Sequence, residues 1–328
     1  MKLALAGDTM LGRGVAEALG SRAPEALVAP EVVAVAGEAD LFVLNLECCI
    51  SEGGEPWPDP GKPFFFRAPP RATELLALLG VDCVTLANNH ALDFGEAALL
   101  DTFAHLGEAG IPWVGAGATV EQARAPVVLE AAGARVAVVA ATDHPEEYAA
   151  GPERPGVAFA DLWSGGIPAW LREAVGAAGG DAVLVTPHWG PNMVGAPLQH
   201  VRDAAAQLLD AGATLVAGHS AHVFHGVGER VLYDLGDFLD DYAVDRVLRN
   251  DLGLLFLVEL DGGRSVRLEA VPLRLEYCHT RLAAGKDAAW IAERFRTACA
   301  ALGTEVAEEE GRLVIDWSAG ISPPSGSP

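Results

Sequence analysis

The chain has 328 residues and 51% of them are apolar, which is enough for one large domain or two small ones with a sizeable core. Its 45 acidic residues against 22 Lys and Arg give a formal net charge of -23. Such a surface repels phosphate backbones and anionic membranes, which argues against nucleic-acid and membrane partners. A small phosphorylated substrate remains compatible, because bound cations reverse the field inside a cleft.

Short apolar runs alternate with amphipathic stretches through the first two thirds of the chain. The runs have the pattern of strands covered on both faces, over residues 3–6, 41–46, 81–87, 135–141, 182–186 and 214–217. Helices are expected over 70–79, 95–109 and 198–211, each closing on a glycine, namely Gly80, Gly110 and Gly212. This alternation predicts an α/β fold with a largely parallel core sheet.

The pattern changes after residue 230, where strands joined by turns are expected over 230–238, 252–260 and 264–275. A helix follows over 287–302 with Asp287 as its candidate N-cap, and a last strand covers 312–317. We therefore expect a main domain over 1–280, with the helix and strand of 281–317 packed on it. The Gly/Ser/Pro-rich tail 318–328 is expected to be disordered.

The sequence shows no clear signal for export or membrane insertion. The first charge that interrupts the apolar N-terminus comes too early for a signal peptide. No window approaches the ~20 apolar residues of a membrane helix. The five cysteines show neither zinc-ligand spacing nor a disulfide framework, so we interpret them as reduced thiols. The expected location is the cytoplasm.

Polar residues follow the predicted strands at the edge where open α/β sheets build ligand sites. The coincidence occurs five times, at Asp8, Glu47, Asn89-His90, His188 and His219. Carboxylates and imidazoles together form a mixed oxygen and nitrogen ligand set. That set suits Mn²⁺, Zn²⁺ or Fe better than Ca²⁺ or Mg²⁺ alone.

Two motifs carry most of this signal. The segment 218–226 holds His219, His222 and His225 between glycines, which indicates a metal or catalytic loop. In the segment 86–95, the amide oxygen of Asn89 can bind a cation and His90 can donate a proton to a leaving group. Asp93 either orients His90 or caps the helix that begins near Gly95.

Other residues are assigned to the substrate side, and each has a second interpretation. A bidentate arginine can clamp an anion, although a surface arginine is an equal alternative, and the phenylalanines of 64–66 are interpreted as core. Asp143-His144 lies either at the site or in a loop that it stabilises. The candidate substrate contacts are Arg13, Arg67, Asn88, His144 and His225. The acids of 234–245 are interpreted as a solvated loop.

The ordered motifs resemble the CapA family of poly-γ-glutamate capsule biosynthesis, a branch of the calcineurin-like metallophosphoesterase superfamily. The resemblance spans roughly 2–260 and rests on 7–13, Asn45-Leu46-Glu47, 87–90 with Asp93 and Gly95, 188–190 and 218–222.

The resemblance implies a four-layer α/β/β/α metallophosphatase-like sandwich with a dimetal centre between its sheets. Glu47 would bridge two metals, in place of the aspartate common in the wider superfamily, and His90 would be the non-ligand histidine beside the reacting group. The other ligands would divide into Asp8 and His222 on the first metal, and Asn89, His188 and His219 on the second.

Two departures from the wider superfamily bear on metal occupancy. Met10 stands where a histidine often follows the first aspartate, and two residues rather than one separate His219 from His222. Both departures resemble the CapA branch, and they leave one metal short of ligands. One or two divalent metals therefore remain possible.

Three functions compete at this stage. The first is metal-dependent hydrolysis of a phosphoester by metal-activated water, with His90 as the acid. The second keeps the metal but makes or cleaves an amide in a glutamyl substrate, as the CapA resemblance implies. The third is a non-catalytic capsule-assembly protein on the same scaffold. In the first two cases the partner is a small anionic substrate.

Overall fold

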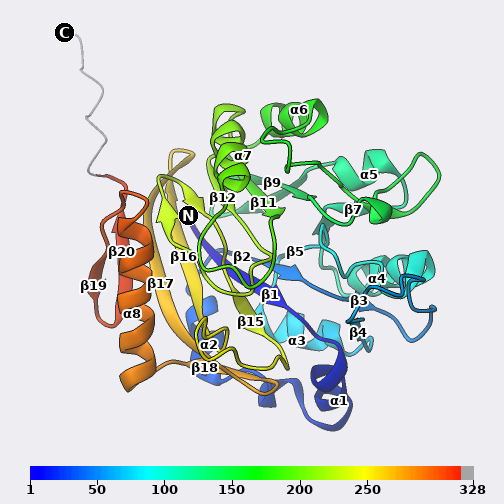
Figure 1. The fold of residues 1–328 in the computed structure, drawn as a ribbon, viewed down its shortest axis with the longest axis horizontal. Helices are drawn as coiled ribbons and strands as arrows, with labels where there is room; N and C mark the ends of the chain where they lie inside the picture. The colour runs from blue at the N-terminus through cyan, green and yellow to red at the C-terminus, as the bar shows by residue number, and fades with distance from the viewer. Residues whose placement is uncertain (319–328) are drawn as a thin grey trace.

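The computed structural model describes residues 1–318, and most of the predicted disordered tail, 319–328, lies outside the described residues. Two large β-sheets lie at the centre and helices cover them on the outside (Figure 1). None of the helices within 1–318 is both long and apolar enough to cross a bilayer.

The larger sheet has ten strands and is mixed in direction. Its path runs β19-β20-β17-β16-β1-β2-β5-β6, with β15 beside β1 and β18 beside β17. The strands β1, β2, β5 and β6 are parallel, and β16, β17 and β20 continue the sheet antiparallel. The bounds are β1 Lys2–Thr9, β2 Leu41–Leu46, β5 Cys83–Thr85, β6 Trp113–Val114, β15 Asp237–Leu239, β16 Leu252–Asp261, β17 Arg264–Glu276, β18 His279–Leu282, β19 Ala307–Glu309 and β20 Arg312–Asp316.

The smaller sheet has six strands in the order β13-β14-β12-β11-β9-β8, and β9, β11, β12 and β14 are parallel. Its strands are β8 Val127–Ala131, β9 Ala134–Thr142, β11 Ala182–His188, β12 Leu215–Ala217, β13 Val227–Gly228 and β14 Val231–Leu232. Two short pairs lie outside it, β3 (Cys49–Ile50) with β4 (Arg67–Ala68) and β7 (Ala116–Gly117) with β10 (Gly156–Val157).

The helices begin and end close to the positions that the glycine signals predict. Gly80 adopts a left-handed conformation (φ 72°) and ends α3, as a glycine C-cap does. The sequence did not predict α1, α2, α5 or α6. The bounds are α1 Arg13–Ser21, α2 Pro30–Ala36, α3 Ala72–Leu79, α4 Gly95–Glu108, α5 Val120–Arg124, α6 Ala169–Ala177, α7 Gln199–Asp210 and α8 Gly285–Ala300.

Alternation of side chains along β1 and β2 explains the layers, because successive residues of a strand face opposite sides of the sheet. Leu3 and Val43 face inward and pack against Val138 and Leu184 of the smaller sheet. The intervening residues face α1 to α4 on the outside, while α6 and α7 cover the far face of the smaller sheet. The four-layer α/β/β/α order is therefore confirmed.

The predicted strand 230–238 is wrong as a single strand, because the chain passes from one sheet to the other within it. Residues 231–232 form β14 in the smaller sheet and 237–239 form β15 in the larger one. Gly236 lies between them with φ 73°, a backbone conformation that glycine adopts without steric cost. This crossing places Asp237 beside Asp8 in the register of β15 and β1.

The C-terminal helix α8 packs its apolar side into the core between the sheets, where Phe295 meets Phe256. Its N-cap residue is Ala284. Asp287 is therefore not the N-cap that the sequence predicts. It lies in the first turn and forms an ion pair with Arg249 at 3.4 Å.

Candidate metal centre

The carboxyl ends of strands from both sheets meet at one place. Asp8 lies near the end of β1, Glu47 directly follows β2, and His188 is the last residue of β11. A bridge between His188 and His219 holds the ends of β11 and β12 together. The parallel arrangement of the strands thus gathers residues that are more than 200 positions apart in the sequence.

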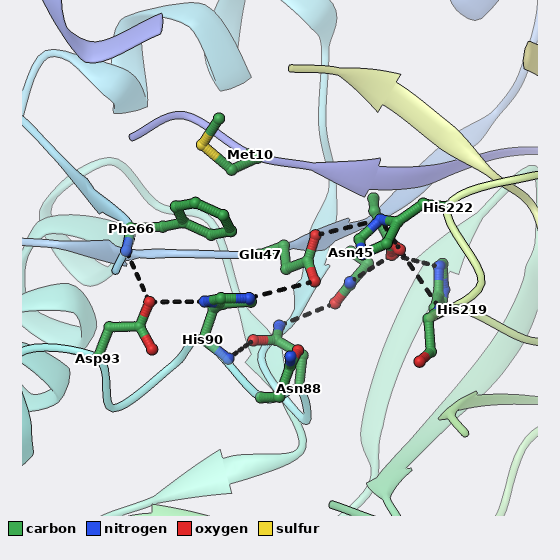
Figure 2. A network of polar contacts seen from close by, with 12 residues as sticks. Met10, Asn45, Glu47, Phe66, Asn88, His90, Asp93, His219 and His222 are labelled. Carbon is green, nitrogen blue, oxygen red and sulfur yellow. Dashed lines mark hydrogen bonds and ion pairs between the residues drawn. The ribbon is translucent and has the colours of Figure 1, made fainter. Parts of the chain in front are cut away.

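Two buried carboxylates and a partly buried imidazole form the centre of this cluster. One ligand atom each from Asp8, Glu47 and His222 lies within 4.8 Å of the others. The Nδ1 atom of His222 is 3.3 Å from Asp8 Oδ2 and 3.9 Å from Glu47 Oε2, while His219 Nδ1 is 3.3 Å from Asp8 Oδ1 (Figure 2). Three candidate ligands are therefore in mutual reach, and His219 adjoins them through Asp8.

The backbone of the 218–226 loop is shaped to present its histidines. His222 has φ 56° and Ser220 has φ 110°, both in the region that side chains other than glycine rarely adopt. Gly218 leaves room for the Trp189 ring, whose Nε1 would lie 2.4 Å from a Cβ at that position. Such strained positions cluster at functional sites.

Asn45 fixes the first aspartate, and the sequence had not singled out its side chain. Its Nδ2 donates to Asp8 Oδ1 at 2.7 Å, and its Oδ1 accepts hydrogen bonds from Thr85 Oγ1 (2.9 Å) and Asn88 Nδ2 (3.0 Å). Asn88 is fully buried, and its Oδ1 accepts from the backbone N–H of His90. The expected substrate contact by Asn88 is therefore wrong, because its polar atoms are already used within the protein.

Asp93 orients His90 rather than capping α4, whose N-cap residue is Phe94. The Oδ2 atom of Asp93 lies 2.6 Å from His90 Nδ1 and accepts the Phe66 N–H at 2.6 Å. This contact leaves His90 Nε2 as the atom facing Glu47 Oε1, at 4.0 Å. Burial lowers the pKa of His90 to about 4, although the Asp93 charge opposes this shift.

Burial and mutual repulsion also shift the pKa values of the acids. Burial and the charge of Asp8 raise the pKa of Glu47 well above its ordinary value. Burial acts to raise the pKa of Asp8 as well, but the imidazoles of His219 and His222 beside it hold that pKa below its ordinary value. Burial therefore disfavours the negative charge of Glu47, while the neighbouring imidazoles favour that of Asp8.

The acidic run 234–245, predicted to be a solvated loop, is the largest error of the sequence interpretation. Asp234, Asp237 and Asp240 are buried, and Asp237 Oδ1 lies 2.8 Å from His222 Nδ1. Burial, with the charge of Asp240, raises the pKa of Asp237. Gly236-Asp237 repeats the Gly7-Asp8 pattern after an apolar run, and that repeat was the available signal.

The donor set fits a divalent cation. Within residues 1–318, several buried atoms of the cluster have no hydrogen-bond partner, and these are Glu47 Oε1, Asn89 Oδ1, His188 Nδ1, His219 Nδ1 and Asp237 Oδ2. Buried polar atoms are normally paired, and an unpaired one costs free energy. Carboxylate, amide and imidazole donors in this number are the ligands that Mn²⁺, Zn²⁺ and Fe accept.

A cavity of about 450 Å³ opens beside the cluster and includes His90, Asn89 and His222 in its lining. Arg13 lines it, with its guanidinium paired to Asp241 and 5.2 Å from the centre of the Phe66 ring. Lys62 lies in the same lining, 2.9 Å from Asp93 Oδ1. The cavity can therefore hold an anionic molecule next to the donor atoms.

Residues 2–242 match the family model described as bacterial capsule synthesis protein PGA_cap. The chain belongs to this family. A probable polyglutamine synthesis accessory protein of Mycobacterium tuberculosis is 32% identical over 88% of each chain. The capsule biosynthesis protein CapA of Bacillus anthracis is 26% identical over 84% of this chain and 68% of its own. The matched region contains the whole donor cluster.

Solved structures share the fold at low sequence identity. A phosphatase of Mycoplasma pneumoniae covers 84% of this chain and 93% of its own with a TM-score of 0.51 and 14% identity. A hypothetical protein of Thermus thermophilus covers 84% and 99% with a TM-score of 0.50 and 17% identity. This PGA_cap family member thus shares its overall fold with that phosphatase.

Two more predicted substrate contacts, Arg67 and His225, lie outside the lining of the cavity in this PGA_cap family member. Arg67 donates to the Gly53 carbonyl at 2.7 Å and covers the Phe94 ring, away from the cavity, so that assignment is wrong. His225 Nε2 lies 2.8 Å from the Val194 carbonyl, outside the lining of the cavity, and is wrong for the same reason.

His144 does reach the site. Its Nδ1 pairs with the Asp143 carboxylate, and its ring centre lies 5.3 Å from that of His188. It lines a second cavity together with His222. Asp143 also accepts the N–H of Gly190 at 2.9 Å. Both interpretations of this pair, a site residue and a stabilised loop, therefore describe part of what the structure contains.

Proposed function

We propose that this PGA_cap family member is a metal-dependent hydrolase of phosphoesters. The observation that carries the proposal is the set of buried donor atoms without partners that surrounds Asp8 and Glu47 and opens on the cavity at His90. Of the thirteen buried side-chain atoms without a hydrogen-bond partner within residues 1–318, five gather at this cluster, although buried polar groups are normally paired.

The residues divide into two groups by contact. Asp8, Glu47 and His222 form the compact group, and His219, His188 and Asn89 supply the further donors that a second cation would need. Asp237 Oδ1 lies 2.8 Å from the same Nδ1 atom of His222 that faces Asp8 and Glu47, so Asp237 is a further carboxylate at the centre. A divalent cation held there would supply a water of lowered pKa and positive charge opposite the phosphoryl oxygens.

His90 performs the proton transfer in this proposal. Because Asp93 engages Nδ1, the imidazole presents Nε2 on the cavity side. A phosphoester anion bound beside His90 would raise the pKa that burial lowers, and the protonated Nε2 would then deliver the proton to the leaving oxygen. The backbone N–H of His90, bound to Asn88, and the stack of its ring on Phe66 at 4.0 Å fix the orientation. Lys62 and Arg13 provide the positive charge that draws an anionic substrate in.

A glutamyl-amide reaction is the second candidate, and the names of the relatives favour it. One relative is named PGA biosynthesis protein CapA, from Bacillus subtilis, with 32% identity over 54% of this chain. In that case the cation would polarise a carbonyl, and the free edge of the Arg13 guanidinium would receive a carboxylate. A non-catalytic role in capsule assembly is the third candidate, and it requires no turnover at all.

Two chromogenic substrates with the same leaving ring separate these candidates. The protein is stripped with a chelator, reloaded with Mn²⁺, Zn²⁺ or Fe²⁺, and assayed with para-nitrophenyl phosphate and γ-glutamyl-para-nitroanilide. The proposal expects phosphoester turnover that disappears on stripping and returns with one of the metals. Turnover of the anilide alone would establish the second candidate, and no turnover of either, with metal bound, the third.

A further inference from the structure

The donor cluster opens on more than one cavity. The first, of about 450 Å³, and the second, of about 280 Å³, share the lining residues Asn89, Asn192 and His222. The cavities therefore adjoin at the cluster and lead away from it over different residues. We call the first the phenylalanine arm, after Phe64 and Phe66, and the second the tryptophan arm, after Trp163.

Each arm carries an exposed aromatic ring. Phe64 is 53% exposed and Trp163 is 51% exposed, although the chain is strongly charged and most of its rings are buried. Phe64 lies parallel to Phe66, with ring centres 6.4 Å apart, and Trp163 is stacked on His200 at 4.2 Å. Large exposed apolar side chains that gather at a cleft mark a binding surface.

The charges of the arms limit what the rings can bind. Among the described residues that line the two arms there is no carboxylate. The two cations, Arg13 and Lys62, both belong to the phenylalanine arm and are paired with Asp241 and Asp93. The positive charge left for a ligand is therefore small, and it suits a singly charged group better than a dianion or a polyanion.

We propose that the substrate is a phosphodiester with a planar or apolar organic group on each side, and this rests on the proposed function. The phosphorus would lie at the donor cluster, and one ester group would occupy each arm. A monoester has a single organic group, so it would leave one arm empty, and the paired cations of the phenylalanine arm would add little positive charge for its second negative oxygen. A polyglutamate chain would bring a carboxylate per residue into the tryptophan arm, which holds no cation.

The reaction is a hydrolysis without any change of oxidation state. The oxygen of water forms a bond to phosphorus, and the bond from phosphorus to one ester oxygen breaks. That oxygen keeps the electron pair and takes a proton, so the products are an alcohol or phenol and a phosphomonoester. The product carries an additional ionisable oxygen, which the paired cations hold weakly and which favours its release.

The test compares bis(para-nitrophenyl) phosphate with para-nitrophenyl phosphate in the metal-loaded, full-length protein. The two share a leaving group and differ in the second ring. We expect kcat/KM to be at least about tenfold higher for the diester. Phe64→Ala and Trp163→Ala should each lower kcat/KM for the diester about fivefold, the value of one aromatic contact. Only one of them should affect the monoester, which occupies one arm.

Phe64 and Trp163 are exposed, so replacing them should leave folding unchanged and a kinetic change can be assigned to the lost ring. The control is Leu100→Ala, a residue 44% exposed on α4 and outside both arms, which should change neither substrate. Faster turnover of the monoester, or a Trp163→Ala variant with unchanged diester kinetics, would overturn the diester inference and leave the phosphoesterase proposal standing. Absence of turnover with both esters at full metal loading would overturn both.

Discussion

Two buried clusters of charge in this molecule are built in opposite ways. In the C-terminal antiparallel part of the larger sheet, Asp251 is almost fully buried and its two oxygens face the guanidinium groups of Arg249 and Arg274. At the centre, Asp8, Glu47 and Asp237 are equally buried, and one oxygen each of Glu47 and Asp237 has no hydrogen-bond partner within 1–318.

The difference indicates that Asp251 stabilises the fold, whereas the central carboxylates are arranged to bind a ligand. A buried carboxylate costs free energy unless cations and hydrogen bonds surround it, and the Asp251 network supplies both. The central cluster lacks an equivalent cationic side chain, although arginines are available elsewhere in the sequence. We infer that its missing positive charge is that of a bound metal, and changes in the two clusters should therefore act on different quantities.

The largest effect should come from Asp8→Asn. This variant removes a charged donor and disturbs Asn45, so bound metal and turnover should both be lost, by more than about a hundredfold, since changes behind the ligands already cost about 10–100-fold. Asp251→Asn is the matched control, an equally buried acid outside the site, and it should keep the metal content and kcat. Metal analysis together with phosphoester kinetics would measure both, and equal losses in the two variants would contradict the comparison.

His90→Ala should separate chemistry from metal binding. We expect kcat to fall about 10²–10⁴-fold, the usual size of general acid–base catalysis, while the metal content stays at the parent value. Asp93→Asn should reproduce part of the loss, because it weakens the hold on Nδ1. If His90→Ala turned over at the parent rate, the acid would have to be another group.

Asp237→Asn should weaken metal binding about 10–100-fold without abolishing it, because it removes a negative charge in contact with His222 while Asp8 and Glu47 remain. The matched control is Asp241→Asn, four residues further on, which faces Arg13 instead of His222. It should keep the metal affinity and change KM. Titration of the stripped protein with Zn²⁺ gives both affinities, and an unchanged value for Asp237→Asn would remove this residue from the centre.

The smallest effects concern stability. Removing a carboxylate charge should lower the free energy of unfolding at the Asp251 network and raise it beside the central cluster. Asp251→Asn leaves two arginines short of charge and should lower the free energy of unfolding by about 2 kcal/mol. Asp240→Asn should instead raise the free energy of unfolding of the metal-free protein near neutral pH. Chemical denaturation of the stripped proteins would show this, and destabilisation by both variants would contradict it.

The sign of the Asp240 effect follows from its pKa. Burial raises the pKa of Asp240 to about 6, above the ordinary value of about 3.9. Its stabilising contribution is therefore complete below about pH 4 and is lost as the pH rises through about 6. Asp240→Asn removes this loss. The variant's free energy of unfolding should therefore exceed that of the parent by a margin that grows to about 2 kcal/mol between about pH 4 and pH 7. An advantage that shrank over this range would be inconsistent with the raised pKa.

Residues that follow directly on predicted strands could be found from the sequence. Apolar runs placed Asp8, Glu47 and His188 at strand ends, and parallel strands carry their ends to one edge. The four-layer order came from the family resemblance. Local pattern thus sufficed wherever position along one strand decided the place of a side chain.

The remaining residues depend on contacts that no local pattern encodes. Asp237 is buried because the chain crosses between sheets at Gly236, and an acidic, glycine-containing segment reads locally as a loop. Phe64 belongs to a run that predicts core, yet it is exposed at a cavity, while Phe66 of the same run is buried. Both errors arise because burial is a property of the tertiary arrangement.

The most direct test of a cation at the centre is anomalous diffraction from crystals of the protein loaded with Mn²⁺ or Zn²⁺. The account predicts a peak about 2.0–2.3 Å from donor atoms of Asp8, Glu47 and His222, and a second peak, if present, beside Asn89, His188 and His219. Crystals of fully loaded protein with no peak among these side chains would contradict it.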